Sequence, residues 1–404
     1  MVFSDSCPLD TGNSFGLPPA LAARHALKVC LAWAIIPCIS CAAAYDPEPI
    51  AEIHLSSVAP GAVGAPAGLS QMVKALAWSP NGKWIAALVG DELCDHRQAD
   101  DLLIVQAPGE HAVANRVHLR RCFEAGWSNL AGAENPLQWS PTSESLVIGG
   151  SAFSGGVLVG FPSGLQNDVP RDCRISGFVT KDSLLGTRRK GDNFWLITYN
   201  LSGKEQTERE LGFIGPLAAF GPPPRVYIGD GHATRVIDPT TNQRLCNGPL
   251  IPEYYGQVSF GNHGNIVCTG SCPDNPLHNN PMVCYDVTKA TEILPRVKVN
   301  NGMPFDIARN SSVLIAADEH QVFSPFIIGF FREGLDGTKL VVKPWVVWDL
   351  AEGRSLMKIS QGSQAPQGKW RLPGRAAMAP DGQRVATAGK DLLRIYRVHA
   401  RSPE

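Results

Sequence analysis

Short apolar strands joined by tight turns recur along this chain. In residues 76–90, LAWSPNGKWIAALVG, an apolar segment runs up to Trp78-Ser79-Pro80, a turn follows at Asn81-Gly82, and a second apolar segment begins. Residues 376–389, AAMAPDGQRVATAG, repeat this pattern near the other end of the sequence. Two apolar runs separated by such turn residues predict a β-hairpin, and its recurrence predicts a structural repeat.

The hairpin pattern occurs seven times. We mark each occurrence by the last large side chain of its first strand. These landmark residues are Trp78, Trp139, Phe178, Phe220, Phe260, Ile307 and Met378. Successive landmarks lie 61, 39, 42, 40, 47 and 71 residues apart. A period near 40 residues with short strands is typical of a β-propeller, in which each blade has four strands.

Several of the units continue with a third apolar strand, which tends to end in a turn before a fourth, outer strand. The predicted third strands are residues 102–108, 193–201, 234–239, 282–287, 345–350 and 392–398. The pairs Asp238-Pro239, Asp286-Val287 and Trp348-Asp349 occupy the same position near the ends of three of them. The last pair lies in VVWDLAEGRSLMKI, which resembles the end of a WD repeat.

Residues 48–399 resemble the WD-repeat and YVTN-type β-propeller superfamily, although the complete Gly-His to Trp-Asp signature is absent. The resemblance implies an all-β fold, which we expect to have seven four-stranded blades. The last unit has no outer strand of its own, and residues 48–57, EPIAEIHLSS, alternate as such a strand should. We therefore expect this N-terminal strand to close the ring and remove an open sheet edge. An eighth blade stays open, because the 71-residue interval has room for one.

The N-terminal segment has a different pattern. Three basic residues, Arg24, His25 and Lys28, precede the apolar run 29–36 and a run of small residues that ends at Ala44. This order predicts a secretory signal within residues 1–44 and a propeller domain over residues 45–404, with a buried helix as the alternative. The apolar run is too short to span a bilayer.

The segment Ile39-Ser40-Cys41 partly matches the site at which lipoproteins are acylated. This match leaves a lipid anchor at Cys41 open as an alternative to cleavage after Ala44. In either case the sequence predicts a secreted or periplasmic protein.

Charge and composition limit the possible partners and the possible fold. The formal net charge is −1, so no overall field attracts nucleic acid or an anionic membrane surface. The 40 glycines and 32 prolines favour many turns over long helices.

Seven cysteines follow the predicted signal: Cys94, Cys122, Cys173, Cys246, Cys268, Cys272 and Cys284. Export would place them in an oxidising compartment, where disulfides form. Cys268 and Cys284 would face each other if the two apolar segments that contain them pair as a hairpin. The scattered spacing disfavours a zinc site, and we expect no metal or other cofactor.

The loops that join second to third strands should all emerge on one face of a propeller. We call this the loop face, and it would gather four aspartates and four histidines: Asp95, His96, Asp230, His232, Asp274, His278, Asp318 and His320. Such residues are common in turns for conformational reasons alone. The alternative is a polar mouth that binds a ligand over the central channel.

An apolar insertion in the sixth unit is the second candidate for binding. Residues 321–345 contain several aromatic side chains, among them Phe326, Phe330 and Phe331, followed by a Gly334–Gly337 turn. Burial against neighbouring blades is one interpretation. A ledge that contacts a partner is the other, because contiguous exposed apolar surface usually marks an interface.

Signatures of enzymes are absent from the sequence. It contains no G-x-S-x-G, no H-E-x-x-H and no glycine-rich phosphate loop before a helix. We therefore predict an exported propeller that serves as a protein-interaction or ligand-binding scaffold. One alternative is a propeller enzyme, a hydrolase, lactonase or quinoprotein-type oxidoreductase, with a site in the central channel. Another is an intracellular WD-repeat scaffold with reduced cysteines.

Overall fold

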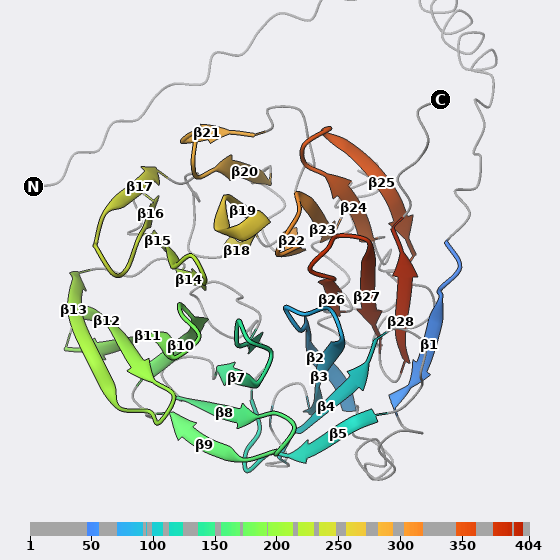
Figure 1. Cartoon of the computed structure of the whole chain (residues 1–404), viewed down its shortest axis with the longest axis horizontal. Helices are drawn as coiled ribbons and strands as arrows, with labels where there is room; N and C mark the ends of the chain where they lie inside the picture. Colours follow the sequence, from blue (N-terminus) through green and yellow to red (C-terminus); the bar gives the residue numbers. More distant parts are fainter. Residues whose placement is uncertain are drawn as a thin grey trace, which may run out of the picture. The chain divides into compact units, whose positions relative to one another are not determined.

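The computed structural model is an all-β structure with a single short 3₁₀ helix, η1 (Asn262–Gly264), among the residues it describes. The described residues are 47–55, 71–91, 94, 99–107, 113–123, 136–149, 155–169, 173–191, 193–212, 217–229, 234–247, 256–271, 282–293, 303–317, 345–360, 375–389 and 392–398. Their strands form seven four-stranded antiparallel sheets, which are arranged in a ring (Figure 1). This is the expected β-propeller.

Within blades 1 to 6, successive strands pair with one another from the centre of the ring outwards (Figure 1). Blades 1 to 3 consist of β2 (Gln71–Trp78), β3 (Trp84–Asp91), β4 (Asp101–Gln106) and β5 (Val113–His118); β6 (Leu137–Trp139), β7 (Ser145–Gly149), β8 (Gly156–Gly160) and β9 (Gln166–Val169); and β10 (Cys173–Phe178), β11 (Ser183–Lys190), β12 (Asn193–Asn200) and β13 (Glu205–Gly212). Blades 4 to 6 consist of β14 (Leu217–Phe220), β15 (Arg225–Gly229), β16 (Thr234–Ile237) and β17 (Arg244–Asn247); β18 (Gly256–Gly261), β19 (Ile266–Ser271), β20 (Val283–Asp286) and β21 (Thr291–Glu292); and β22 (Met303–Ile307), β23 (Val313–Ala317), β24 (Trp345–Asp349) and β25 (Arg354–Ile359).

Blade 7 combines the two ends of the propeller. Its inner strands are β26 (Arg375–Met378), β27 (Arg384–Ala388) and β28 (Leu392–Arg397), and its outer strand is β1 (Ala51–His54). β1 pairs antiparallel with β28, with Ala51 opposite Ile395, and an ion pair of 2.7 Å joins Arg394 to Glu52. The prediction that an N-terminal strand closes the ring is confirmed, and the described strands form seven blades.

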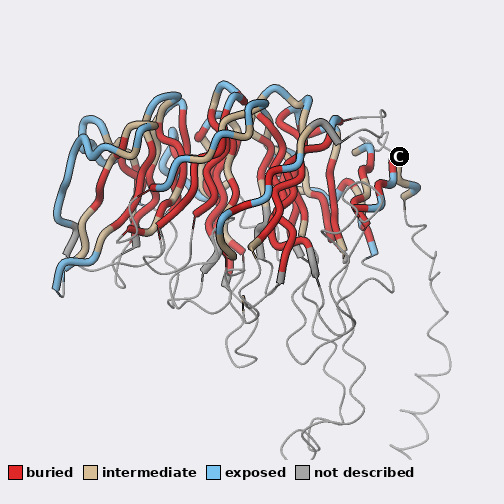
Figure 2. The backbone as a smooth tube through the Cα atoms, turned by 90° about the horizontal axis from the view of Figure 1, so that it is seen from below, coloured by how far each residue is buried: buried red, intermediate tan, exposed pale blue. Residues whose placement is uncertain are grey.

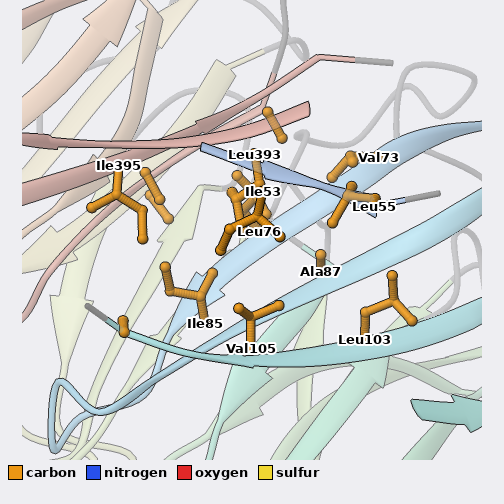
Figure 3. Packing of buried hydrophobic residues seen from close by; sticks show 14 of the residues in the cluster. Ile53, Leu55, Val73, Leu76, Ile85, Ala87, Leu103, Val105, Leu393 and Ile395 are labelled. Carbon is orange, nitrogen blue, oxygen red and sulfur yellow. The ribbon is translucent and has the colours of Figure 1, made fainter. Parts of the chain in front are cut away.

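Apolar side chains fill the space between neighbouring blades. Between blades 7 and 1, Ile53 and Leu393 lie in the same buried cluster as Leu76 and Val105, and each of the four has at most 5% of its surface exposed (Figure 3). Figure 2 shows the consequence for the ring as a whole: the strands are mostly buried, whereas the turns along one edge are exposed. The core is therefore a series of inter-blade layers.

The landmark residues of the repeat hold neighbouring inner strands together. The indole Nε1 of Trp78 donates a hydrogen bond of 3.1 Å to the carbonyl oxygen of Ala377 in blade 7. The indole of Trp139 donates in the same way, at 3.1 Å, to Ala77 in blade 1. A buried indole needs such an acceptor, and these two find it on the preceding blade.

Side-chain oxygens shape the turns that the sequence pattern predicted. In blade 1, Ser79 Oγ accepts from the backbone N–H of Trp84 at 2.9 Å, and Gly82 takes up a φ of +71°, which glycine adopts without steric cost. At the ends of the third strands, Asp238 and Asp286 each accept from the backbone N–H two residues later, at 2.8 and 2.9 Å. The recurring Asp thus starts the turn to the outer strand.

The predicted disulfide between Cys268 and Cys284 is present. The two residues lie directly opposite each other on β19 and β20, with their Cα atoms 4.0 Å apart. The bond therefore joins the second and third strands of blade 5.

Candidate functional site

The residues predicted for the loop face and for the apolar ledge lie outside the described residues. These are Asp95, His96, Asp230, His232, Asp274, His278, Asp318 and His320 on the loop face, and Phe326, Phe330 and Phe331 on the ledge. Both assignments therefore stay predictions. The described residues do show two polar features. One lies in blade 1, at the end where β3 leads to β4, and the other lies at the opposite end of the channel.

A buried ion pair lies at the loop-face end of blade 1. The ammonium Nζ of Lys74 on β2 is 2.8 and 3.1 Å from the two carboxylate oxygens of Asp100, which immediately precedes β4. Both side chains are fully buried. Nζ also donates to the carbonyl oxygen of Phe123 at 2.8 Å, and the backbone N–H of Phe123 donates to Asp100 at 2.8 Å. The pair therefore binds the segment after β5 to the start of β4.

A second disulfide packs against this ion pair. Cys94, in the connection from β3 to β4, is bonded to Cys122, and Nζ of Lys74 lies 3.1 Å from the sulfur of Cys122. The opposite wall is Gly90, where a Cβ would lie 1.8 Å from a carboxylate oxygen of Asp100. We call Lys74, Gly90, Cys94, Asp100 and Cys122 the blade 1 clamp.

Burial sets the electrostatics of the clamp. It raises the pKa of Asp100 to about 6, against the opposing effect of the Lys74 ammonium and of the hydrogen bond from Phe123. Two charges taken out of water at this position gain stability only through their contact with each other and with polar neighbours. Asp100, at the start of β4, is thus held by an ion pair and a backbone hydrogen bond, and Cys94 is held by a covalent bond.

A cavity of about 160 Å³ lies at the other end of the channel, where the inner strands meet their first turns. Residues of all seven inner strands or of the turns that follow them line it, and most are apolar. Its large apolar walls are Trp78, Leu137, Trp139, Phe220, Phe260, Ile307 and Met378. Its polar walls are Gln138, Ser176, Ser259, Asp306 and Arg309.

Asp306 and Arg309 are the charged residues among the described lining of this cavity. Asp306 accepts a backbone hydrogen bond of 2.8 Å from Met378 in blade 7, and burial raises its pKa to about 7. The Arg309 guanidinium donates to the carbonyl oxygen of Gly221 and lies over the Phe220 ring, 4.6 Å from its centroid. Burial lowers the pKa of Arg309 to about 10.

Gln138 crosses from blade 2 to two other blades inside the channel. Its Oε1 accepts from the backbone N–H of Phe178 at 2.5 Å, and its Nε2 donates to the carbonyl oxygen of Ala219 at 3.3 Å. These contacts account for the close approach of Gly177, where an added Cβ would lie 1.9 Å from Oε1 of Gln138. The side chain therefore helps to fix the width of the channel.

Within the described part of the chain, no group of three or more His, Cys, Asp or Glu residues could hold a metal ion. Nor does any helix there have the length and apolar character needed to cross a membrane. Comparison with known proteins adds no assignment, because no protein-family model and no curated protein match the chain. The arrangement of the strands shows a β-propeller. The comparisons do not assign the chain to the WD-repeat or YVTN-type families.

Sequence reasoning missed both polar features. Lys74 stands in the apolar strand QMVKALAW, and a single lysine in such a strand was the available signal for a buried charge. Asp306 and Arg309 lie in FDIARN, where the repeat pattern identifies the landmark Ile307 and gives no sign of a buried charge. The pairing of Cys94 with Cys122 had no signal in spacing, because an entire third and fourth strand lie between the two residues.

Proposed function

We propose that this protein is an exported β-propeller scaffold that binds a protein partner or an extracellular ligand on its loop face. The observation that carries the proposal is the blade 1 clamp, in which Lys74, Asp100 and the Cys94–Cys122 disulfide hold the β3–β4 connection. Anchoring the β3–β4 connection at Cys94 and Asp100 lowers the entropy that the connection itself would lose when a partner binds.

The two disulfides support export. Disulfides persist in oxidising compartments and are rare in the cytosol, so Cys94–Cys122 and Cys268–Cys284 agree with a secreted or periplasmic protein. N-terminal sequencing of the mature protein should begin at Tyr45, or at a lipid-modified Cys41. A full-length product that begins at Met1 and carries eleven free thiols would contradict export and favour the intracellular scaffold.

The binding role is tested by comparing two faces of the same ring. The bait is the chain from Tyr45 onwards, used to capture proteins from native envelope material. One variant, H96A/H278A, changes two predicted loop-face residues. The control variant, K83A/Q383A, changes two exposed residues in the first turns of blades 1 and 7.

We expect H96A/H278A to lose the captured species and K83A/Q383A to retain them. K83A/Q383A should melt within a degree or two of the wild type, because substitutions of exposed residues usually change stability by no more than about 0.5 kcal/mol. A thermal melt of H96A/H278A checks that this variant is folded. Equal capture by both variants would remove the loop face as the binding surface. Loss with the control variant alone would assign binding to the opposite face.

A further inference from the structure

We propose that the cavity at the first-turn end of the channel is a binding site for a small zwitterion, such as a free amino acid. The ammonium of the ligand would contact Asp306, and its carboxylate would contact Arg309. This site is independent of the loop face and lies at the other end of the channel.

Neither charge in the cavity wall has an ionic partner among the described residues. Among the described residues Asp306 takes part in no ion pair, and its hydrogen bonds come from the backbone N–H groups of Met378 and Ile307. Arg309 is likewise in no ion pair with a described residue, and its guanidinium contacts a carbonyl oxygen and an aromatic ring. Both side chains are partly buried, and withdrawing a charge from water without a counter-charge is costly, so a ligand that supplies the counter-charge is favoured.

Their opposite signs select the class of ligand. A simple cation would satisfy Asp306 but would meet the guanidinium of Arg309 in the same cavity, and a simple anion would meet the converse repulsion. Asp306 and Arg309 line one cavity, so a molecule that carries one charge of each sign matches both residues.

The remaining lining fits the body of such a molecule. A cavity of about 160 Å³ has the size of one that holds a benzene-sized ligand. The hydroxyl oxygen of Ser176 lines it, is buried, and has no hydrogen-bond partner among the described residues. Buried hydroxyls almost always have a partner, so Ser176 is a further group that a polar ligand would satisfy.

The site is tested by isothermal titration of the mature protein with L-alanine and with 4-aminobutanoate, which differ in the spacing of their charges. Butylamine and butanoate are the controls that carry a single charge. We expect at least one zwitterion to bind tenfold or more tightly than either control, since hydrogen bonds to charged groups are worth about one or two factors of ten.

Two variants separate the roles of the charges. Asp306→Asn keeps an oxygen to accept the N–H of Met378, so the fold should persist while the zwitterion binds no better than butanoate. Arg309→Gln should reduce the zwitterion to the affinity of butylamine. A thermal melt of each variant checks folding, and Ser176→Ala provides a third variant that changes no charge and should weaken binding about threefold to tenfold.

The proposal is overturned if neither zwitterion binds more tightly than the controls. It is also overturned if a folded Asp306→Asn variant binds the zwitterion as the wild type does. Capture of a partner by the loop face would be unaffected by either result, so the two proposals fail separately.

Discussion

Removing the ammonium from the blade 1 clamp should destabilise the propeller strongly. In Lys74→Met the apolar stem is kept, but the contacts of Nζ with Asp100, at 2.8 and 3.1 Å, and with Phe123, at 2.8 Å, are lost. The Asp100 carboxylate would keep the backbone N–H of Phe123 but no counter-charge. Breaking a buried ion pair from one side costs about 3–5 kcal/mol, and we expect a loss of this size at pH 8.

The cost should depend on pH, with a sign fixed by Asp100. Its pKa in the folded protein is already raised, to about 6, and it should rise further once the opposing Lys74 charge is removed. A carboxyl whose folded pKa lies above its unfolded value contributes stability below the unfolded pKa and loses it as pH rises through the folded pKa. The difference between Lys74→Met and wild type should therefore be smaller at pH 5 than at pH 8.

The assay is urea unfolding followed by tryptophan fluorescence, with the disulfides intact. Lys204→Met is the matched control, because Lys204 is exposed, and it should stay within about 0.5 kcal/mol of the wild type. The double variant K74M/D100N removes both charges and should recover at least half of the loss. A Lys74→Met variant less than about 1 kcal/mol below the wild type at pH 8 would refute the reasoning, as would a double variant no more stable than the single one.

Three further predictions concern closure, stapling and the sixth-blade insertion. Ile53→Asp places a charge in the layer between blades 7 and 1, and should lower the melting temperature and open β1 to limited proteolysis; an unchanged melt would contradict the closure argument. C268A/C284A should cost about 2–4 kcal/mol in urea unfolding, and no change would show that the bond does not constrain the unfolded chain. We expect Phe330 and Phe331 to be core residues, so F330S/F331S should reduce thermal stability by about 3–5 kcal/mol for each ring. An unchanged melt together with lost association would instead support the ledge.

The sequence predicted the blades because the information for them is local. An apolar strand, a Ser-Pro or Pro-Asp turn and a second strand lie within about 15 residues, and the same argument found the Cys268–Cys284 pair across β19 and β20. The sequence also predicts closure by β1, because the last unit lacks an outer strand and an open sheet edge is unfavourable. This prediction needs no knowledge of tertiary contacts.

The polar features could not be predicted in the same way. Lys74 meets Asp100 and Cys122 only after the four strands of blade 1 have paired, and the bulge between Val73 and Ala75 changes the alternation of β2 at that point. Asp306 and Arg309 become neighbours of one cavity only when seven inner strands surround it. Such features depend on tertiary contacts that no local pattern encodes.

Closure through β1 also sets the order of events when the protein is made. Glu52 and its partner Arg394 are 342 residues apart, so the outer strand of blade 7 is synthesised long before the strand with which it pairs. At about 5–20 residues per second, the interval is roughly 17–70 s. Until then β28 is missing, and β1 has no strand with which to pair. Closure of the ring is therefore the last pairing available to the growing chain, which needs protection from aggregation until β28 has been made.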